Sequence, residues 1–162
     1  MSRKLEKILE DNRRVIIIKI TRELKNSGSE HFGKMDSKEI KERVQKLYQS
    51  LMDAVIEKNF MVFIDYVEDL TLKRIEEGFG LKEIQLSLTS LEKNVWKIIV
   101  DESSINDVIK YLGIITNIIG EGKDHIARIF LEQKKKMENL ILDLKKDHKK
   151  LFEDLDLANI LA

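Results

Sequence analysis

Hydrophobic residues recur along this chain at intervals of three and four, with charged residues between them. This period is typical of amphipathic α-helices that bury one face. The run Val15–Ile18 alone would also suit a strand, but helix formers flank it and no second strand exists to pair with it. We therefore predict an all-α bundle of five to six helices with a long C-terminal exit helix. The expected helices cover residues 3–25, 36–57, 60–77, 81–100, 105–119 and the segment that follows.

Breaks between these helices are marked by small and polar residues. Residues 26–35 contain two serines and two glycines and are expected to form a loop. Asp36 and Glu39 have the spacing of a capping box, which predicts a helix start. A short break is expected at Lys58–Asn59, and Gly78 suits the left-handed position that ends a helix.

From Gly120 to Ala162 the pattern narrows to two apolar rows that repeat every seven residues. Alternating steps of four and three are typical of a coiled-coil seam. Gly120 and Gly122 either break the preceding helix or mark where it leaves the bundle. We expect a helical bundle over 1–131 and a coiled-coil-like extension over 132–162, paired in parallel. The seam consists of Ala127, Phe130, Lys134, Met137, Ile141, Leu144, His148, Leu151 and Leu155.

Two polar residues interrupt this seam and lower its expected stability. Lys134 and His148 occupy positions where a coiled coil prefers apolar side chains. A histidine there can fix the register of pairing or make pairing sensitive to pH. The alternative is that the ring of His148 simply turns to solvent beside a loose pairing.

Composition restricts the partners. Lys plus Arg and Asp plus Glu number 29 each, so no overall positive field favours nucleic acid. The lysine run 134–136 and the lysines after it are interrupted by acidic residues, as on an ordinary solvated helix face. Proline and cysteine are absent, which permits long helices and excludes disulfides and thiolate metal sites. With no signal peptide or membrane span in the pattern, we expect a cytoplasmic protein without membrane partners.

Motifs of catalysis are missing. The glycines do not have the spacing of a phosphate-binding loop or a dinucleotide fingerprint, and no nucleophile elbow occurs. Glu121 and His125 are four residues apart and would offer two metal ligands on one helix face, but the sequence supplies no third. We predict that the chain is not an enzyme and carries no metal or cofactor.

The stretch from Arg74 to Ile84 resembles a known family. An arginine near a helix end, then Gly78-Phe79, one residue and Leu81, is similar to the N-terminal domain of RsbT co-antagonist proteins, the RsbR-type regulators of the bacterial stressosome. The resemblance extends from about residue 3 to 131. It implies a helical, often globin-like sensory module that dimerises and acts through its exit helix on an output domain. Family members carry a STAS domain after the linker, whereas this chain ends at Ala162.

These observations predict a bacterial signalling module. Its bundle would sense a stimulus, and its exit helix would form a homodimer and relay the state to an output domain or a protein partner. The turn formed by Arg74, Gly78, Phe79 and Leu81 is either a structural seal over the core or a partner surface. The alternative function is a helical domain that binds haem or an apolar ligand between helices, with Gly113 and Ala127 leaving space for it.

Overall fold

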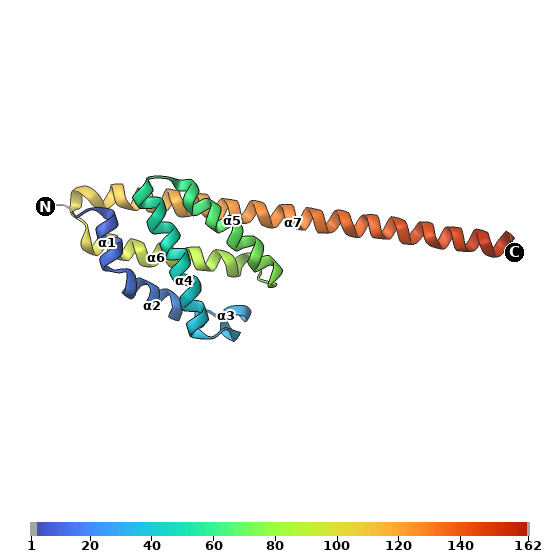
Figure 1. Ribbon diagram of the computed structural model, residues 1–162, viewed down its shortest axis with the longest axis horizontal. Helices are drawn as coiled ribbons and strands as arrows, with labels where there is room; N and C mark the ends of the chain where they lie inside the picture. The colour runs from blue at the N-terminus through green and yellow to red at the C-terminus, as the bar shows by residue number, and fades with distance from the viewer. Residues whose placement is uncertain (1–2, 162) are drawn as a thin grey trace.

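The computed structural model describes residues 3–161, which form seven α-helices and no strand. Six shorter helices form a bundle with the first part of one long C-terminal helix, which continues beyond them as a single rod (Figure 1). The predicted all-α bundle with a long C-terminal helix is confirmed. The helices are α1 (Leu5–Asp11), α2 (Arg13–Lys25), α3 (Glu30–Lys34), α4 (Ser37–Glu57), α5 (Phe60–Glu76), α6 (Leu81–Glu102) and α7 (Ile105–Leu161).

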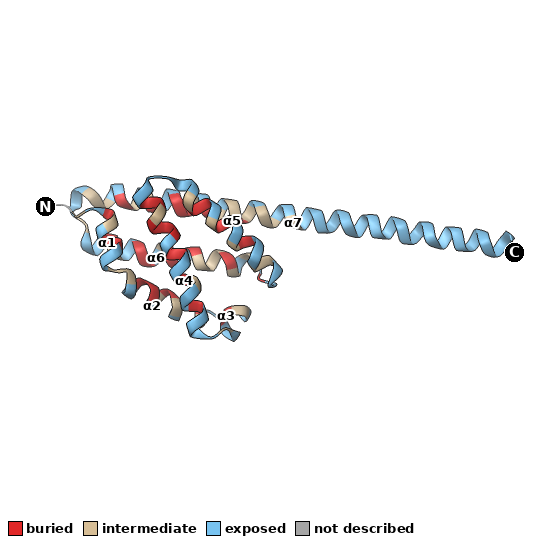
Figure 2. Ribbon diagram, viewed as in Figure 1, coloured by how far each residue is buried: buried red, intermediate tan, exposed pale blue. Residues whose placement is uncertain are grey.

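The core lies between these helices and stops where the rod begins. α7 packs against α5 and α6, while α2 packs against α4 and α6. Buried residues are confined to the bundle, and the rod beyond it is exposed on every side (Figure 2). The fully buried Tyr48 is hydrogen-bonded within the core, since its hydroxyl donates to the carbonyl of Leu9 at 2.7 Å. Among the described residues, no helix combines the length and the apolarity that crossing a membrane requires.

The N-terminal segment differs from the prediction in two places. The expected helix over 3–25 is divided at Asn12, whose side-chain amide donates to the carbonyl of Ile8 at 2.8 Å. A side chain that competes for a backbone carbonyl in this way favours a break. The expected loop over 26–35 contains the short helix α3, because the Ser29 hydroxyl caps it by accepting from the Phe32 amide.

The other predicted boundaries agree with the structure, with one change of partner. Asp36 caps α4, but its carboxylate accepts from the Lys38 amide, and Glu39 pairs with Arg43 instead of completing a capping box. The break at Lys58–Asn59 is present, with Lys58 left-handed at a φ of 52°. Gly78 has a φ of 89°, as predicted for the residue that ends α5.

The glycines of α7 do not break it. The helix runs without interruption through Gly120 and Gly122, so neither marks its exit from the bundle. Gly122 instead permits close packing: a Cβ there would lie 2.8 Å from Cε1 of Phe63 and 3.2 Å from Cδ2 of Leu88. A glycine costs only about 1 kcal/mol in a helix interior, and the close approach of α5 and α6 offsets that cost.

We therefore expect substitution by alanine to have opposite effects on stability at Gly120 and at Gly122. Gly122→Ala should destabilise the protein by about 1–3 kcal/mol, because Phe63 and Leu88 must move to admit the methyl group. Gly120→Ala meets nothing within 4 Å and should stabilise by roughly 0.5–1 kcal/mol through helix propensity alone. Urea unfolding followed by circular dichroism measures both, and equal effects would contradict the packing argument.

Candidate functional site

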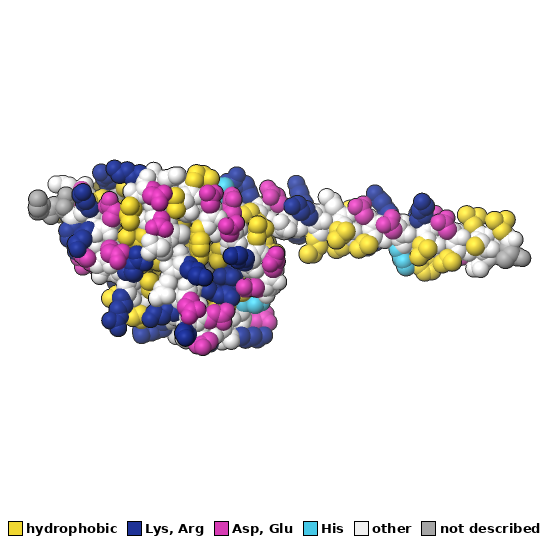
Figure 3. Space-filling model, viewed as in Figure 1, with side chains coloured by type: hydrophobic (Ala, Val, Ile, Leu, Met, Phe, Trp, Pro, Cys, Tyr) yellow, Lys and Arg dark blue, Asp and Glu magenta, His cyan; other side chains and the backbone are white. Residues whose placement is uncertain are grey.

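The predicted seam residues share one face of α7. The helix is continuous across all nine of them, so the steps of four and three keep them on one side. Beyond the bundle this face is open: Met137 is 65% exposed, Leu144 59% and Leu155 52%. Figure 3 shows hydrophobic side chains collected along one edge for most of the rod, with charged side chains on the opposite edge; near the C-terminal end hydrophobic side chains lie on both edges. The structure thus presents the seam as an apolar stripe that no element within residues 3–161 covers.

The first seam residues connect the stripe to the core. Ala127 and Phe130 are half-buried, and the Phe130 ring packs against the core cluster. From Lys134 to Leu161 every side chain is exposed. At about 1.5 Å per residue, this unsupported part of the helix is roughly 40 Å long.

Three apolar residues beside the seam were not predicted as part of it. Leu131, Leu140 and Phe152 are 62%, 59% and 54% exposed, and each directly flanks a seam position. The Phe152 ring meets His148 edge to face, with 4.6 Å between ring centroids. Their heptad positions, next to the two apolar rows, were the available signal. They widen the stripe from a narrow coiled-coil seam toward a broader contact surface.

A second cluster of side chains surrounds Phe79, in the turn between α5 and α6. Phe79 is 4% exposed, lies edge-on to Phe32 and stacks on His31 with 4.5 Å between ring centroids. The guanidinium groups of Arg43 and Arg74 lie over the same ring at 6.0 and 5.7 Å. The structural role predicted for Phe79, closing the core above Gly78, agrees with this burial.

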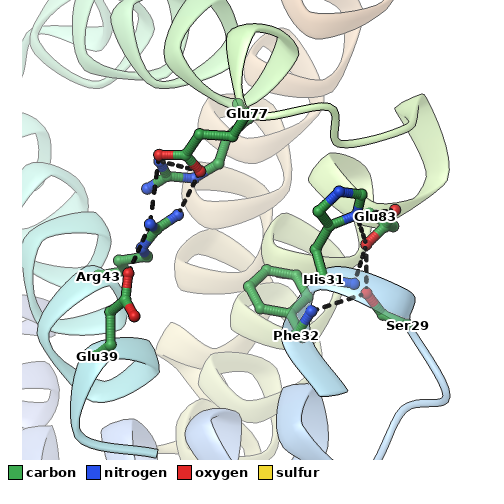
Figure 4. A network of polar contacts seen from close by, with 8 residues as sticks. Ser29, His31, Phe32, Glu39, Arg43, Glu77 and Glu83 are labelled. Carbon is green, nitrogen blue, oxygen red and sulfur yellow. Dashed lines mark hydrogen bonds and ion pairs between the residues drawn. The ribbon is translucent and has the colours of Figure 1, made fainter. Parts of the chain in front are cut away.

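Ion pairs surround the turn on one side of Phe79. Glu77 accepts from Arg43 at 2.9 Å and from Arg74 at 3.2 Å, and Glu39 also pairs with Arg43 (Figure 4). Arg74 lies in the last turn of α5, and its guanidinium pairs with the carboxylate of Glu77. Burial, followed by the positive charge of Arg43, lowers the pKa of Arg74.

On the other side, Glu83 joins α6 to the loop before α3. Its carboxylate accepts from the Ser29 hydroxyl at 2.5 Å, from the His31 amide at 3.1 Å, and lies 2.9 Å from the His31 ring (Figure 4). Burial alone would raise the pKa of Glu83, but these hydrogen bonds and that from the Gly80 amide lower it from 4.5 to about 2. The carboxylate is therefore a clamp between two segments far apart in sequence.

This clamp predicts an acid-sensitive contribution to stability. Because folding lowers the pKa of Glu83, its contribution is complete above pH 4.5 and is lost as the pH falls from 4.5 toward 2. Glu83→Gln should remove that contribution at neutral pH and flatten the stability profile over this interval. Urea midpoints measured from pH 7 to pH 3 give the comparison, and parallel profiles for the two proteins would contradict it.

His125 does not pair with Glu121, the residue that could have joined it at a metal site. His125 lies on α7, and its Nδ1 is 2.8 Å from a carboxylate oxygen of Glu68 on α5, not of Glu121. Within residues 3–161 no group of three or more potential ligands is close enough to hold a metal ion. His148 lies on the exposed stripe, and His31 belongs to the Phe79 turn.

Space for a ligand is limited in the core but present at the surface. The cavity beside Phe79 measures about 20 Å³, which is room for one water molecule and too little for haem. Gly113 is exposed with nothing near it, so the cavity expected there is not formed. A groove of about 530 Å³ lies between α1, the end of α4 and α7. Its lining includes Leu5, Val55, Ile118 and three lysines, Lys4, Lys58 and Lys110.

Comparisons with known proteins add no relative. The chain matches no protein-family model, no curated protein and no solved structure at a significant level. The resemblance of the Arg74–Ile84 stretch to RsbT co-antagonist domains therefore stays a prediction, and the geometry of the stripe and the turn carries the functional argument.

Proposed function

We propose that this chain is a non-enzymatic signalling module that self-associates through the stripe of its exit helix and passes a change in its bundle along that helix. One observation carries the proposal. α7 is a single helix whose first part is buried in the core and whose last part is an exposed apolar stripe.

The exposed part of α7 receives no stabilising contact from the other described helices. Helices owe most of their stability in proteins to packing of an apolar face, and from Lys134 onward this face packs on nothing here. A stripe that persists for about four heptads is typical of a helix that pairs with another helix. Pairing supplies the missing contacts.

Mechanical continuity supports the relay. Ile119 and Ile126 are fully buried against the bundle, and the seam begins at the next residue. A rotation or shift of α7 in response to α5 and α6 therefore moves the stripe as well, because no proline or break separates them. The RsbR-type resemblance agrees with such an arrangement, and a stress-sensing role in the cytoplasm is part of the same proposal.

Self-association and relay are tested together by sedimentation velocity and amide hydrogen exchange on the full chain over a range of concentrations. Dimerisation should slow exchange in residues 134–155 and alter it in α5 and α6. A chain that stays monomeric at high concentration with an intact bundle would refute the proposal. If hydrogen exchange changes only in the rod, the protein dimerises but the relay to α5 and α6 is refuted.

A second candidate function rests on the groove between α1, α4 and α7. Apolar side chains and three lysines line it beside the single carboxylate of Glu6, and this mixture suits a small amphiphile with an apolar tail and a carboxylate. Native mass spectrometry with decanoate is the direct test. Bound mass that disappears in Lys58→Glu and Lys110→Glu would favour it, and no bound mass would exclude this ligand class.

A further inference from the structure

The stripe faces the same side of α7 as the bundle does. Ile119, Ile126, Phe130 and Met137 follow one another at steps of seven, four and seven, so they form one row along the helix. The first two are buried against the bundle, Phe130 packs at its rim, and Met137 is exposed. Figure 3 shows the hydrophobic edge of the rod on the side where the bundle lies. A partner of the stripe therefore lies in line with the bundle.

This placement disfavours two copies paired in parallel. Paired helices lie about 8–10 Å apart. In a parallel pair, the helices would come this close at Ala127, and the first half of each α7 would lie beside the other's bundle. Yet α5 and α6 already occupy that side of α7 around Gly122, and α7 is uninterrupted there. The two bundles would therefore overlap sterically.

We infer that the exit helix pairs with a second copy of this chain in an antiparallel arrangement centred between Ile141 and Leu144. The inference rests on the proposed self-association and adds its orientation and register. Each bundle then lies at the opposite end of the shared rod. Leu155 of one copy lies level with Phe130 of the other, and only residues 156–161 pass beside the partner's bundle. The facing pairs are Lys134 with Leu151, Met137 with His148 and Ile141 with Leu144, each formed twice.

Side chains that flank the stripe agree with this register. In antiparallel coiled coils, residues following the second apolar row face their equivalents across the pair. Glu138 then lies beside Lys145 of the second copy, which gives two pairs of opposite charge. Leu131 likewise meets Phe152, so these two exposed apolar side chains beside the seam cover each other. On the other flank Leu140 lies beside Asp147, and no like charges meet.

Shifting the register by one heptad removes this agreement. If the centre moves one heptad toward the bundle, Glu138 faces Glu138 of the second copy. If it moves one heptad away from the bundle, Lys145 faces Lys145 of the second copy and Asp147 faces Asp147. A parallel pair in register places Lys134 against Lys134 and His148 against His148, and offers no pair of opposite charges on its flanks. The antiparallel pairing centred between Ile141 and Leu144 avoids all of these contacts.

Because the chain contains no cysteine, disulfide formation between introduced cysteines reports the arrangement without background. Met137→Cys alone should not cross-link, since the two copies of residue 137 would be roughly 16 Å apart along the axis. An equimolar mixture of Met137→Cys and a mass-tagged His148→Cys should give the mixed disulfide as the main product. Sedimentation of each variant under reducing conditions shows whether it still associates.

The outcomes separate orientation from association. Self-cross-linking of Met137→Cys in an associated protein would overturn the antiparallel pairing and leave the dimer intact. Association without either disulfide would also overturn the inference, because the contact would then lie elsewhere. A monomer under all conditions would refute the proposed function itself.

A charge exchange gives an independent measurement on the full chain. Glu138→Lys should weaken association roughly tenfold, because the new lysine of each copy would lie beside Lys145 of the other copy. Glu138→Lys with Lys145→Glu should restore it by recreating both pairs in reverse. Equal association of all three proteins would overturn the register, since neither residue has a charged counterpart in the parallel pair.

Discussion

Replacing Leu144 with aspartate should weaken self-association at least roughly 100-fold. Burying a leucine contributes about 1.5–3 kcal/mol, and a symmetric pair loses that contribution twice. The aspartate would in addition place a charge opposite the apolar Ile141 of the second copy. Sedimentation equilibrium gives the dissociation constant, and circular dichroism shows whether the bundle remains folded.

Leu142 provides the matched control. It is 53% exposed, close to the 59% of Leu144, but it lies on the polar side of the rod. Leu142→Asp should leave the dissociation constant within about threefold of the original, because the same change in charge and hydrophobicity then occurs away from the contact. Equal loss of association in both variants would show that general hydrophobicity of the rod, and not the stripe, drives self-association.

Phe79→Ala should lower the free energy of unfolding by about 3–5 kcal/mol, the usual cost of removing a buried aromatic ring. The ring is 4% exposed and contacts Phe32, His31 and two guanidinium groups. Its loss leaves Arg74 partly buried over an empty space, which adds to the cost. Urea unfolding followed by circular dichroism measures the change.

Phe60→Ala is the comparison for this substitution. Phe60 is 40% exposed at the start of α5, so its truncation should cost clearly less than that of Phe79. A loss below about 1 kcal/mol for Phe79→Ala would contradict a structural role for the turn. It would favour the other interpretation, in which Phe79 and Arg74 serve a partner.

The Phe79 turn and the stripe lie in different parts of the molecule and have different proposed roles. The Phe79 turn ties α3, α4, α5 and α6 together through one ring and two carboxylates, Glu77 and Glu83. The stripe lies on the one helix that leaves this assembly. In the antiparallel pair that we propose, the end of each exit helix would lie beside the partner's bundle, so each bundle would contact the rod of the other copy.

Local patterns in the sequence predicted most of the helices because their causes are local. The apolar period of α4 to α7, the cap at Asp36 and the left-handed glycine at 78 depend only on neighbouring residues. The division at Asn12 escaped prediction, since the apolar period continues across it and the break follows from one side-chain hydrogen bond.

Contacts between distant residues were beyond the sequence. Gly122 resembles a helix breaker along the chain, and only the approach of Phe63 and Leu88 shows why a glycine lies there. His125 was placed with Glu121 by spacing, but packing of α7 on α5 brings it to Glu68. The cluster of Ser29, His31 and Glu83 could not be predicted either, because Glu83 is more than 50 residues from the other two along the chain.

The helical fold and the apolar stripe on the last helix could both be predicted, because each follows from the spacing of residues along one helix. The packing of the helices was needed to show that the stripe begins at the rim of the core and faces the side of the bundle. That direction depends on how α5 and α6 pack on α7, and it is what favours an antiparallel second copy over a parallel one.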